Sequence, residues 1–351
     1  MKRNGYIDIV KFFFALVIAE FHVNSGLFPG GRLACEVFFM INGFLMMRSL
    51  EKDKSEKILI PSANFIIKKF KALFYYLLPA AIISYIVICQ YKDWALDLSL
   101  KRLPLLIFEI FPLYITGIKG EYVVGVSWYL SAMLLSLAIL YPLCKKFGRS
   151  FSLVVCPIIS IFGYGTLSQF FGNLAANKQY VPETIIRAGL LRGVACIALG
   201  CFLYEISKMI ANKKPTVLAR VLFTGIELLG FTYLAYIMRH LSMTIHEYIG
   251  VIVIFILLFI GINGLSFFSY LWNPKWTKHF GTASITIILS HSCWVRYLGK
   301  ELGKEFAKTS LVIWYVIAII ATCIVVYICS ILLKFLFSCV GKIKLFKNEQ
   351  E

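Results

Sequence analysis

Residues 311–337 read LVIWYVIAIIATCIVVYICSILLKFLF, an apolar run whose only charged residue is Lys334. About 20 consecutive apolar residues are enough to cross the hydrocarbon core of a bilayer as a helix. Irregular backbone is not tolerated against lipid, because its N–H and C=O groups would lack hydrogen bonds there. The run therefore predicts a membrane-spanning helix.

The same signal recurs along the chain. Hydrophobic residues make up 60% of the 351 residues, charged residues make up 15%, and the mean hydropathy is +0.80. We predict an all-α, polytopic integral membrane protein of about ten spans. One further segment, 103–118, is interrupted by prolines and a glutamate and is typical of a re-entrant or interfacial segment. The predicted spans are 6–28, 33–50, 70–90, 125–144, 150–171, 185–207, 217–238, 247–264, 280–298 and 311–337.

The distribution of charge predicts the orientation. The chain has 36 Lys and Arg residues against 18 Asp and Glu residues, and the basic residues fall between the apolar runs. Roughly twice as many lie on one side of the predicted membrane as on the other, which places both termini in the cytoplasm. We expect a single transmembrane domain over 1–338 and a short basic cytoplasmic tail at 339–351. A soluble enzyme, a disordered chain and a nucleic-acid-binding protein are excluded.

The ten cysteines mostly lie inside apolar runs and show no paired loop spacing. This pattern predicts small buried hydrophobic side chains rather than disulfides or metal ligands.

The first predicted helix carries polar residues, although a charge at the bilayer centre costs about 2.5–3.5 kcal/mol on insertion scales. Lys11 and His22 are eleven residues apart. This spacing is a net rotation of roughly 20°, so they share one helix face about 16 Å apart. Asp8 precedes Lys11 by one turn and can pair with it.

Glu36 lies near the outer end of the second predicted helix, at a depth similar to that of His22. A hydrogen-bonded carboxylate orients an imidazole and raises its basicity, which suits a general base. The alternative is a structural histidine satisfied by a backbone carbonyl. We favour the catalytic interpretation because Lys11 lies in register with the pair.

Lys68 and Lys71 lie one turn apart on the predicted inner side of the third helix. With Lys11 they can form a cationic mouth for a phosphate-rich cytoplasmic ligand. The positive-inside rule alone would produce the same lysines, so both interpretations stay open. His291 either lines the cavity or bonds a neighbouring helix, and Arg192 is deep enough to face an acceptor path.

These residues, in this order, resemble the motifs of acyltransferase family 3, integral membrane proteins that act on cell-surface carbohydrates. The motifs are Asp8 with Lys11 and His22, Glu36-Val37-Phe38-Phe39 with Asn42-Gly43, Lys68 with Lys71, Ser127-Trp128-Tyr129-Leu130, and Phe280-Gly281 with Ser284 and His291. The chain departs from the family pattern at Lys11, Lys68 and Lys71, where the family has arginine, and at Asn42, where it has serine. Lysine keeps the charge but loses bidentate phosphate recognition.

The resemblance implies transfer of an acyl group, usually acetyl, from cytoplasmic acyl-CoA to a hydroxyl of a cell-surface carbohydrate or lipid-linked glycan. It also implies a multi-pass location in a bacterial inner or plasma membrane, with membrane lipids around the chain. Acetyl-CoA is the expected acyl donor, and neither a metal nor a nucleic acid is expected. The implied site has His22 as general base, Glu36 as its orienting partner, Lys11, Lys68 and Lys71 for the CoA phosphates, and Asp8, Asn42, Trp128 and His291 in supporting positions. We add Arg192 to the supporting positions because of its depth in the sixth predicted helix.

The main alternative is a transporter or a flippase of a lipid-linked sugar, which buried charges in ten helices would also suit. Transporters often show inverted repeats and matched broken helices near the midplane. The two halves of this sequence do not echo each other, and the polar cluster lies in the first three predicted helices. A purely structural membrane protein would leave the register of Lys11, His22 and Glu36 unexplained.

Overall fold

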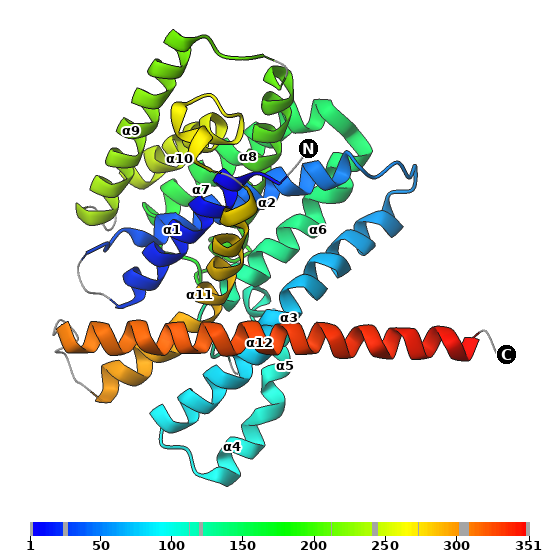
Figure 1. Cartoon of the computed structure of the whole chain (residues 1–351), viewed down its shortest axis with the longest axis vertical. Coiled ribbons are helices and arrows are strands. Elements are labelled where there is room, and N and C mark those ends of the chain that lie inside the picture. The colour runs from blue at the N-terminus through cyan, green and yellow to red at the C-terminus, as the bar shows by residue number, and fades with distance from the viewer. Residues whose placement is uncertain are drawn as a thin grey trace.

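The computed structural model describes residues 3–23, 27–111, 113–118, 122–211, 213–240, 245–272, 274–301 and 309–348. Across these residues the chain is predominantly helical and forms no β-strand (Figure 1). The long helices are α1 (Gly5–Val23), α2 (Ala34–Leu50), α3 (Leu59–Tyr91), α6 (Ser127–Ser150), α7 (Cys156–Phe171), α8 (Ala188–Ile210), α9 (Val217–His240), α10 (His246–Ile262), α11 (Pro274–Glu301) and α12 (Thr309–Asn348). The short helical pieces are η1 (Gly31–Leu33), α4 (Leu96–Arg102), η2 (Leu103–Leu106), α5 (Ile107–Ile110), η3 (Tyr114–Thr116), η4 (Phe151–Val155) and η5 (Phe267–Leu271).

The long helices match the predicted apolar runs one by one. Within the described ranges, six segments are long and apolar enough to cross a membrane. The prediction of an all-helical membrane protein is confirmed, whereas the count of ten passes and the cytoplasmic termini stay predictions. The six segments are Gly31–Leu50, Leu59–Tyr91, Ser127–Phe171, Ala188–Ile210, Val217–His240 and Ile313–Cys339.

The chain reverses direction inside Ser127–Phe171. Gly148 has φ 65° and ψ −147°, a backbone conformation that glycine adopts at the lowest cost. The Sγ atoms of Cys144 and Cys156 lie within 4.8 Å of each other, although a straight helix would separate these positions by about 18 Å. Helices α6 and α7 therefore form a hairpin, which agrees with the separation of the predicted spans 125–144 and 150–171.

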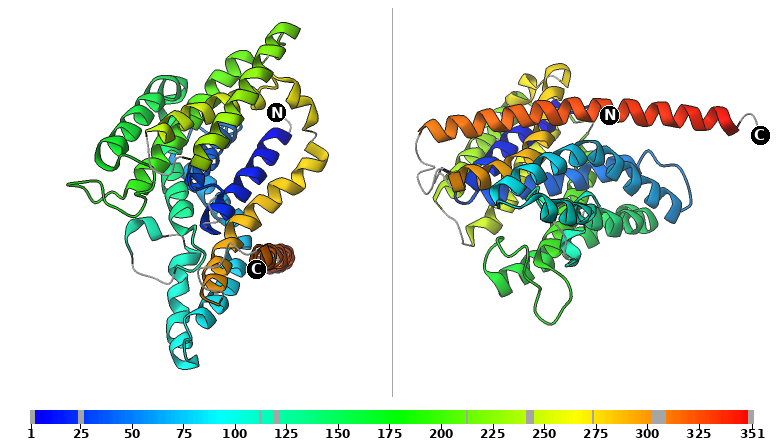
Figure 2. Two further views of the ribbon diagram at one scale, coloured as in Figure 1. Left: turned by 90° about the vertical axis from the view of Figure 1, so that its left-hand side faces the viewer. Right: turned by 90° about the horizontal axis from the view of Figure 1, so that it is seen from below.

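Two helix pairs form the centre of the molecule. Helix α1 packs along α11 (Figure 2, left). Helix α2 packs along α8. The backbones of α2 and α8 touch at Gly43 and Gly200, because a Cβ on Gly43 would lie 2.1 Å from the carbonyl oxygen of Ile197. A Cβ on Gly200 would lie equally close, at 2.1 Å, to the carbonyl oxygen of Met40. Small residues permit this close approach of membrane helices.

Helix α4 and the first part of the predicted re-entrant segment 103–118 run back along α3. Residue 112 of that segment lies outside the described residues. The Tyr85 hydroxyl donates to the Ser99 carbonyl at 2.6 Å, and the Phe70 ring stacks on Phe111 with centroids 5.4 Å apart. These two contacts lie roughly 22 Å apart along the axis of α3. The chain from α4 through α5 therefore follows the side of α3, whereas η3 packs against α6.

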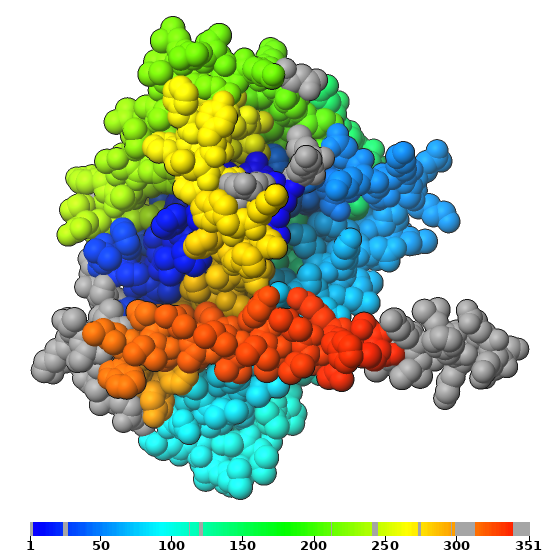
Figure 3. Space-filling model, viewed as in Figure 1, coloured from blue at the N-terminus to red at the C-terminus, as the bar shows by residue number. Residues whose placement is uncertain are grey.

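The predicted cytoplasmic segments gather at one end of the helix bundle, which we call the inner end. There the Asn4 side chain donates to the Ile262 carbonyl at 2.9 Å, and Lys208 pairs with Glu51 at 2.6 Å. The opposite end, which carries His22, is the outer end. Helix α12 crosses the bundle against α3 and α11 (Figure 3) and continues through residue 338, the predicted domain boundary.

Candidate active site

His22 lies in the last turn of α1, at the outer end, where α11 passes alongside. Its Nδ1 atom is 2.8 Å from the Ile18 carbonyl oxygen and 3.3 Å from Nε2 of His291. The His22 side chain is exposed, whereas His291 is fully buried. The sequence left open whether His291 lines the cavity or bonds a neighbouring helix. In the structure His291 contacts a neighbouring helix, α1, and its partner there is His22, the candidate general base.

The backbone selects a tautomer for each ring. Nδ1 of His291 lies 3.1 Å from the Ile287 carbonyl, just as Nδ1 of His22 lies beside the Ile18 carbonyl. A carbonyl oxygen accepts only, so Nδ1 carries the hydrogen in each neutral ring. Nε2 of His291 is then an acceptor directed at Nδ1–H of His22. The basic lone pair of His22 consequently lies on its Nε2 atom.

A cavity of about 90 Å³ opens beside His22, and we call it the outer cavity. Its polar lining includes Trp128 at the start of α6 and Asn177 from the loop before α8. Phe38 and Tyr129 form part of its apolar wall. The cavity thus offers aromatic and amide groups around the imidazole, a lining that suits a polar acceptor molecule.

A second cavity of about 180 Å³, the inner cavity, lies beyond a shared wall. Both cavities are lined by Phe38, Tyr129 and Ile288, so one layer of side chains separates them. Lys11 and Lys69 line the inner cavity, and no acidic residue among the described ones does. An uncompensated pair of ammonium groups in a membrane-embedded cavity favours an anionic ligand.

Asn42 connects this cationic cavity to the shared wall. The Lys69 ammonium donates to Oδ1 of Asn42 at 3.2 Å, and Nδ2 of Asn42 donates to the Tyr129 hydroxyl at 3.3 Å. Nδ2 also donates to the Phe38 carbonyl at 2.9 Å. Asn42 therefore holds a lysine and a wall residue in fixed positions.

Lys68 and Lys71, the predicted ligands of a phosphate, are both exposed and line neither cavity. The residue between them, Lys69, lines the inner cavity instead. The reason is helical phase, because Lys69 lies four residues before Leu73, which lines the same cavity. The structure therefore brings Lys69, rather than Lys68 or Lys71, to the inner cavity.

Glu36 does not pair with His22, and this predicted contact is wrong. The carboxylate is fully buried and accepts from Nε of Arg192 and, at 2.5 Å, from the Tyr164 hydroxyl. Glu36 precedes Gly43 by seven residues, two helical turns, so both face α8. The close contact of α2 with α8 therefore turns Glu36 away from α1.

Arg192 supports the floor of the outer cavity rather than facing an open path. Its guanidinium is buried and donates to the carbonyls of Leu174 at 2.8 Å and Arg32 at 2.9 Å. It also donates to Oδ1 of Asn177 at 3.0 Å and lies 5.4 Å from the ring centroid of Trp128. Three residues that line the outer cavity, Arg32, Trp128 and Asn177, thus contact one arginine.

Sequence reasoning missed Lys69, Arg32, Asn177 and Tyr129. Arg32 lines the outer cavity and pairs, buried, with Glu247 of α10. Arg32 left a signal as a charge directly before an apolar run, and Tyr129 stands in the Ser127-Trp128-Tyr129-Leu130 motif. Lys69 and Asn177 needed the helix phase and the loop path that the structure supplies.

Asp8 pairs with Arg3 rather than with Lys11. The Asp8 carboxylate accepts from Nε of Arg3 at 2.5 Å and from its NH2 atom at 2.9 Å. This hydrogen bond raises the pKa of the Arg3 guanidinium above its usual value. Lys11 makes no ion pair within the described ranges, so its charge stays available to the inner cavity.

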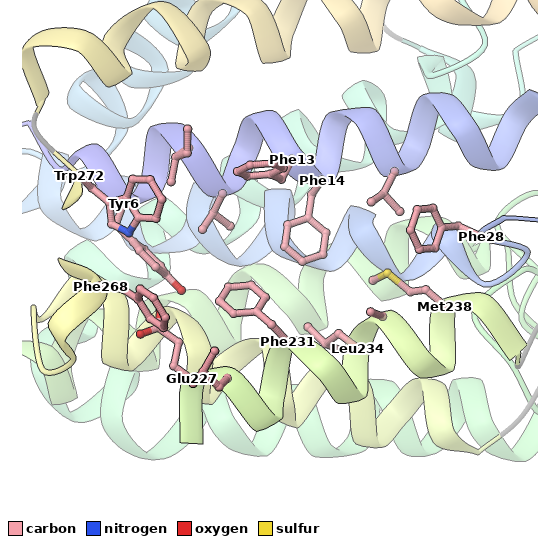
Figure 4. A pocket seen from close by; sticks show the side chains of 15 residues that line it. Tyr6, Phe13, Phe14, Phe28, Glu227, Phe231, Leu234, Met238, Phe268 and Trp272 are labelled. Atoms are coloured by element: carbon pink, nitrogen blue, oxygen red, sulfur yellow. The ribbon is translucent and has the colours of Figure 1, made fainter. Parts of the chain in front are cut away.

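A larger cavity, of about 420 Å³, lies on the opposite face of α1, between α1 and α9. We call it the apolar groove. Phe13 and Phe14 of α1 face Phe231 and Leu234 of α9 across it, and Glu227 lies at one end (Figure 4). Its polar groups are few, chiefly Glu227 and the Tyr6 hydroxyl, so its size alone does not make it an active site.

The family model described as an acyltransferase domain, that of acyltransferase family 3, matches residues 4–331. The chain belongs to this family. The match spans nearly the whole described bundle and includes every candidate site residue named above. No curated protein and no solved structure matches the chain. The protein is thus a membrane acyltransferase.

Proposed function

We propose that this acyltransferase moves an acyl group, most simply acetyl, from cytoplasmic acyl-CoA to a hydroxyl of a cell-envelope or surface polysaccharide sugar. The observation that carries the proposal is the pair of adjoining cavities, one with two lysines and one with His22, separated by Phe38, Tyr129 and Ile288. A donor with anionic phosphates and an acceptor with a hydroxyl would meet at that shared wall.

The donor enters from the inner end. The ammonium groups of Lys11 and Lys69 attract the CoA phosphates, and only the slim pantetheine arm extends along the inner cavity toward Tyr129. Lys68 and Lys71 contribute to the surrounding positive potential from the exposed face of α3. The thioester carbonyl then lies at the shared wall, within reach of the outer cavity.

The acceptor enters from the outer end, where His22 is exposed. Nε2 of His22 takes the proton of the sugar hydroxyl while that oxygen forms a bond to the thioester carbonyl carbon. The tetrahedral intermediate then expels the CoA sulfur, and the imidazolium returns the proton to the thiolate. The products are an acyl ester and free CoA. His291 is a positioning residue here, since its Nε2 accepts from the Nδ1–H of His22.

The membrane setting follows the same proposal. We place ten passes in a bacterial inner or plasma membrane, with both termini and the inner end in the cytoplasm, where acyl-CoA is made. The catalytic domain covers 1–338, and 339–351 forms a basic tail. A flippase of lipid-linked sugars has less support, because cavities of about 90 and 180 Å³ are small for such a cargo.

Purified protein, radiolabelled acetyl-CoA and envelope polysaccharide test the proposal. We expect label in the polysaccharide as an alkali-labile ester, with one CoA released per ester formed. Label that appears without CoA release, or none with any envelope glycan offered, contradicts it. A flippase would instead move a lipid-linked sugar across a vesicle membrane with no need for CoA.

A further inference from the structure

Three cysteines face one another near the inner end of the bundle, away from both candidate cavities. They are Cys144 of α6, Cys156 of α7 and Cys201 of α8, and their Sγ atoms all lie within 4.8 Å of one another. All three side chains are buried, with exposed fractions of 1%, 0% and 0%. None of them contacts the His22 site, so the proposed acyl transfer leaves the cluster unexplained.

The fold alone creates this cluster. Cys144 and Cys156 meet because the chain reverses at Gly148, and Cys201 joins them because α8 packs against both helices of the hairpin. The thiols come from three separate helices, whose packing fixes their positions. Such a site differs from a flexible loop motif, because its thiol groups are in place before any ion binds.

We propose that Cys144, Cys156 and Cys201 bind a thiophilic d10 cation, Cu(I) or Zn²⁺. A metal–sulfur bond of about 2.3 Å places the sulfurs of such a site roughly 3.8–4.0 Å apart, so a movement of each sulfur by at most about half an ångström closes this cluster around an ion. Soft thiolates select these metals over Mg²⁺ or Ca²⁺. Each thiol loses its proton on binding, and the protons leave to solvent.

A route to the cluster leads from the inner surface. A cavity of about 230 Å³ is lined by Cys144 and by the thioether of Met47, together with Glu51 and Glu205. The basic partners of these carboxylates, Lys208 and Arg149, have side chains that are 41% and 62% exposed. Because Lys208 and Arg149 are exposed, they can adopt rotamers that point into solvent. A cation that enters this cavity then meets carboxylates and sulfur atoms.

Metal content of the full-length protein tests the proposal. Protein purified with a non-thiol reductant is incubated with Zn²⁺ in one arm and Cu(I) in the other, desalted and analysed by elemental mass spectrometry. We expect about one ion per chain in at least one arm, and the arm that fills identifies the metal. The same stoichiometry is expected for Cys89→Ser, which removes a half-buried cysteine of α3 outside the cluster.

The cluster variants Cys156→Ser and Cys144→Ser/Cys201→Ser are expected to lose this ion. Because a variant can lose metal by misfolding, X-ray absorption on the loaded wild-type protein gives a second measurement. We expect three sulfur neighbours at about 2.3 Å. Metal that persists in the double variant, a shell of nitrogen and oxygen only, or wild-type protein that retains no ion in either arm overturns the proposal.

Discussion

The two faces of helix α1 border cavities of opposite character. One face carries Lys11 and His22 into the inner and outer cavities, and the other lines the apolar groove with aromatic side chains. The groove is the larger space, yet its polar groups are few, chiefly Glu227 and the Tyr6 hydroxyl at one end. In a membrane, an apolar cavity exists at little cost, whereas a lysine or an imidazole held in the bundle is costly. Converging polar atoms therefore mark the site better than volume does.

Removal of the imidazole is the strongest test of the polar face. His22→Ala is expected to lower the rate of acyl transfer by about 10²–10⁴-fold, the usual contribution of a general base. The exposed His240 at the end of α9 provides the matched control, and His240→Ala should keep the wild-type rate. Both variants should keep the wild-type melting temperature in detergent. Retained transfer in His22→Ala would remove this residue from the mechanism.

Glu36→Gln separates a catalytic carboxylate from a structural one. The change leaves the buried charge of Arg192 uncompensated, and breaking one partner of a buried ion pair typically costs about 3–5 kcal/mol. We expect the melting temperature and the transfer rate to fall together. A variant that melts like wild type but is as slow as His22→Ala would show that Glu36 takes part in the chemistry.

His291→Phe preserves ring volume while it removes the acceptor beside Nδ1 of His22. Because His291 does not line the inner cavity, we expect kcat to fall by about 10–100-fold with the KM for acyl-CoA unchanged. Steady-state kinetics at several acetyl-CoA concentrations separate the two parameters. An increase of KM alone would place His291 in donor binding rather than in positioning the base.

The lysine cluster of α3 allows Lys69, which lines the inner cavity, to be compared with its exposed neighbour Lys68 in acyl-CoA binding. Lys69→Met should raise the KM for acyl-CoA by about tenfold, as expected for one lost charge-assisted contact. Lys68→Met removes an exposed charge one residue away and should change KM by less than about twofold. If Lys68→Met is the more damaging variant, the donor binds outside the inner cavity.

The smallest effects on acyl transfer are expected from an alanine-to-leucine substitution, made once in the inner cavity and once in the apolar groove. Ala72 lines the inner cavity and Ala235 lines the apolar groove. Ala72→Leu narrows the donor path and should reduce kcat/KM for acyl-CoA severalfold, whereas Ala235→Leu should leave it within about twofold. A large loss in Ala235→Leu, with the melting temperature unchanged, would mean that the groove belongs to the site after all.

The sequence predicted the positions of the helices well, but it predicted poorly which side of each helix faces which neighbour. Apolar runs such as 311–337 must be helical in lipid, and hydropathy therefore located nearly every element. Hydropathy could not predict that Lys69 faces the inner cavity, because three lysines within one turn do not show which side of α3 faces the bundle. It could not find the partner of Glu36, because Arg192 lies 156 residues further along the chain. Contacts between distant helices are set by packing, which periodicity in one segment does not encode.

The Glu36–Arg192 ion pair also has a consequence for biosynthesis. At roughly 5–20 residues per second, the ribosome needs about 8–30 s to reach Arg192 after it has made Glu36. Through that interval the nascent amino-terminal half contains a carboxylate whose counter-charge does not yet exist. The insertion machinery must shelter that carboxylate until α8 arrives, so assembly of the amino-terminal helices waits on a helix from the second half of the gene.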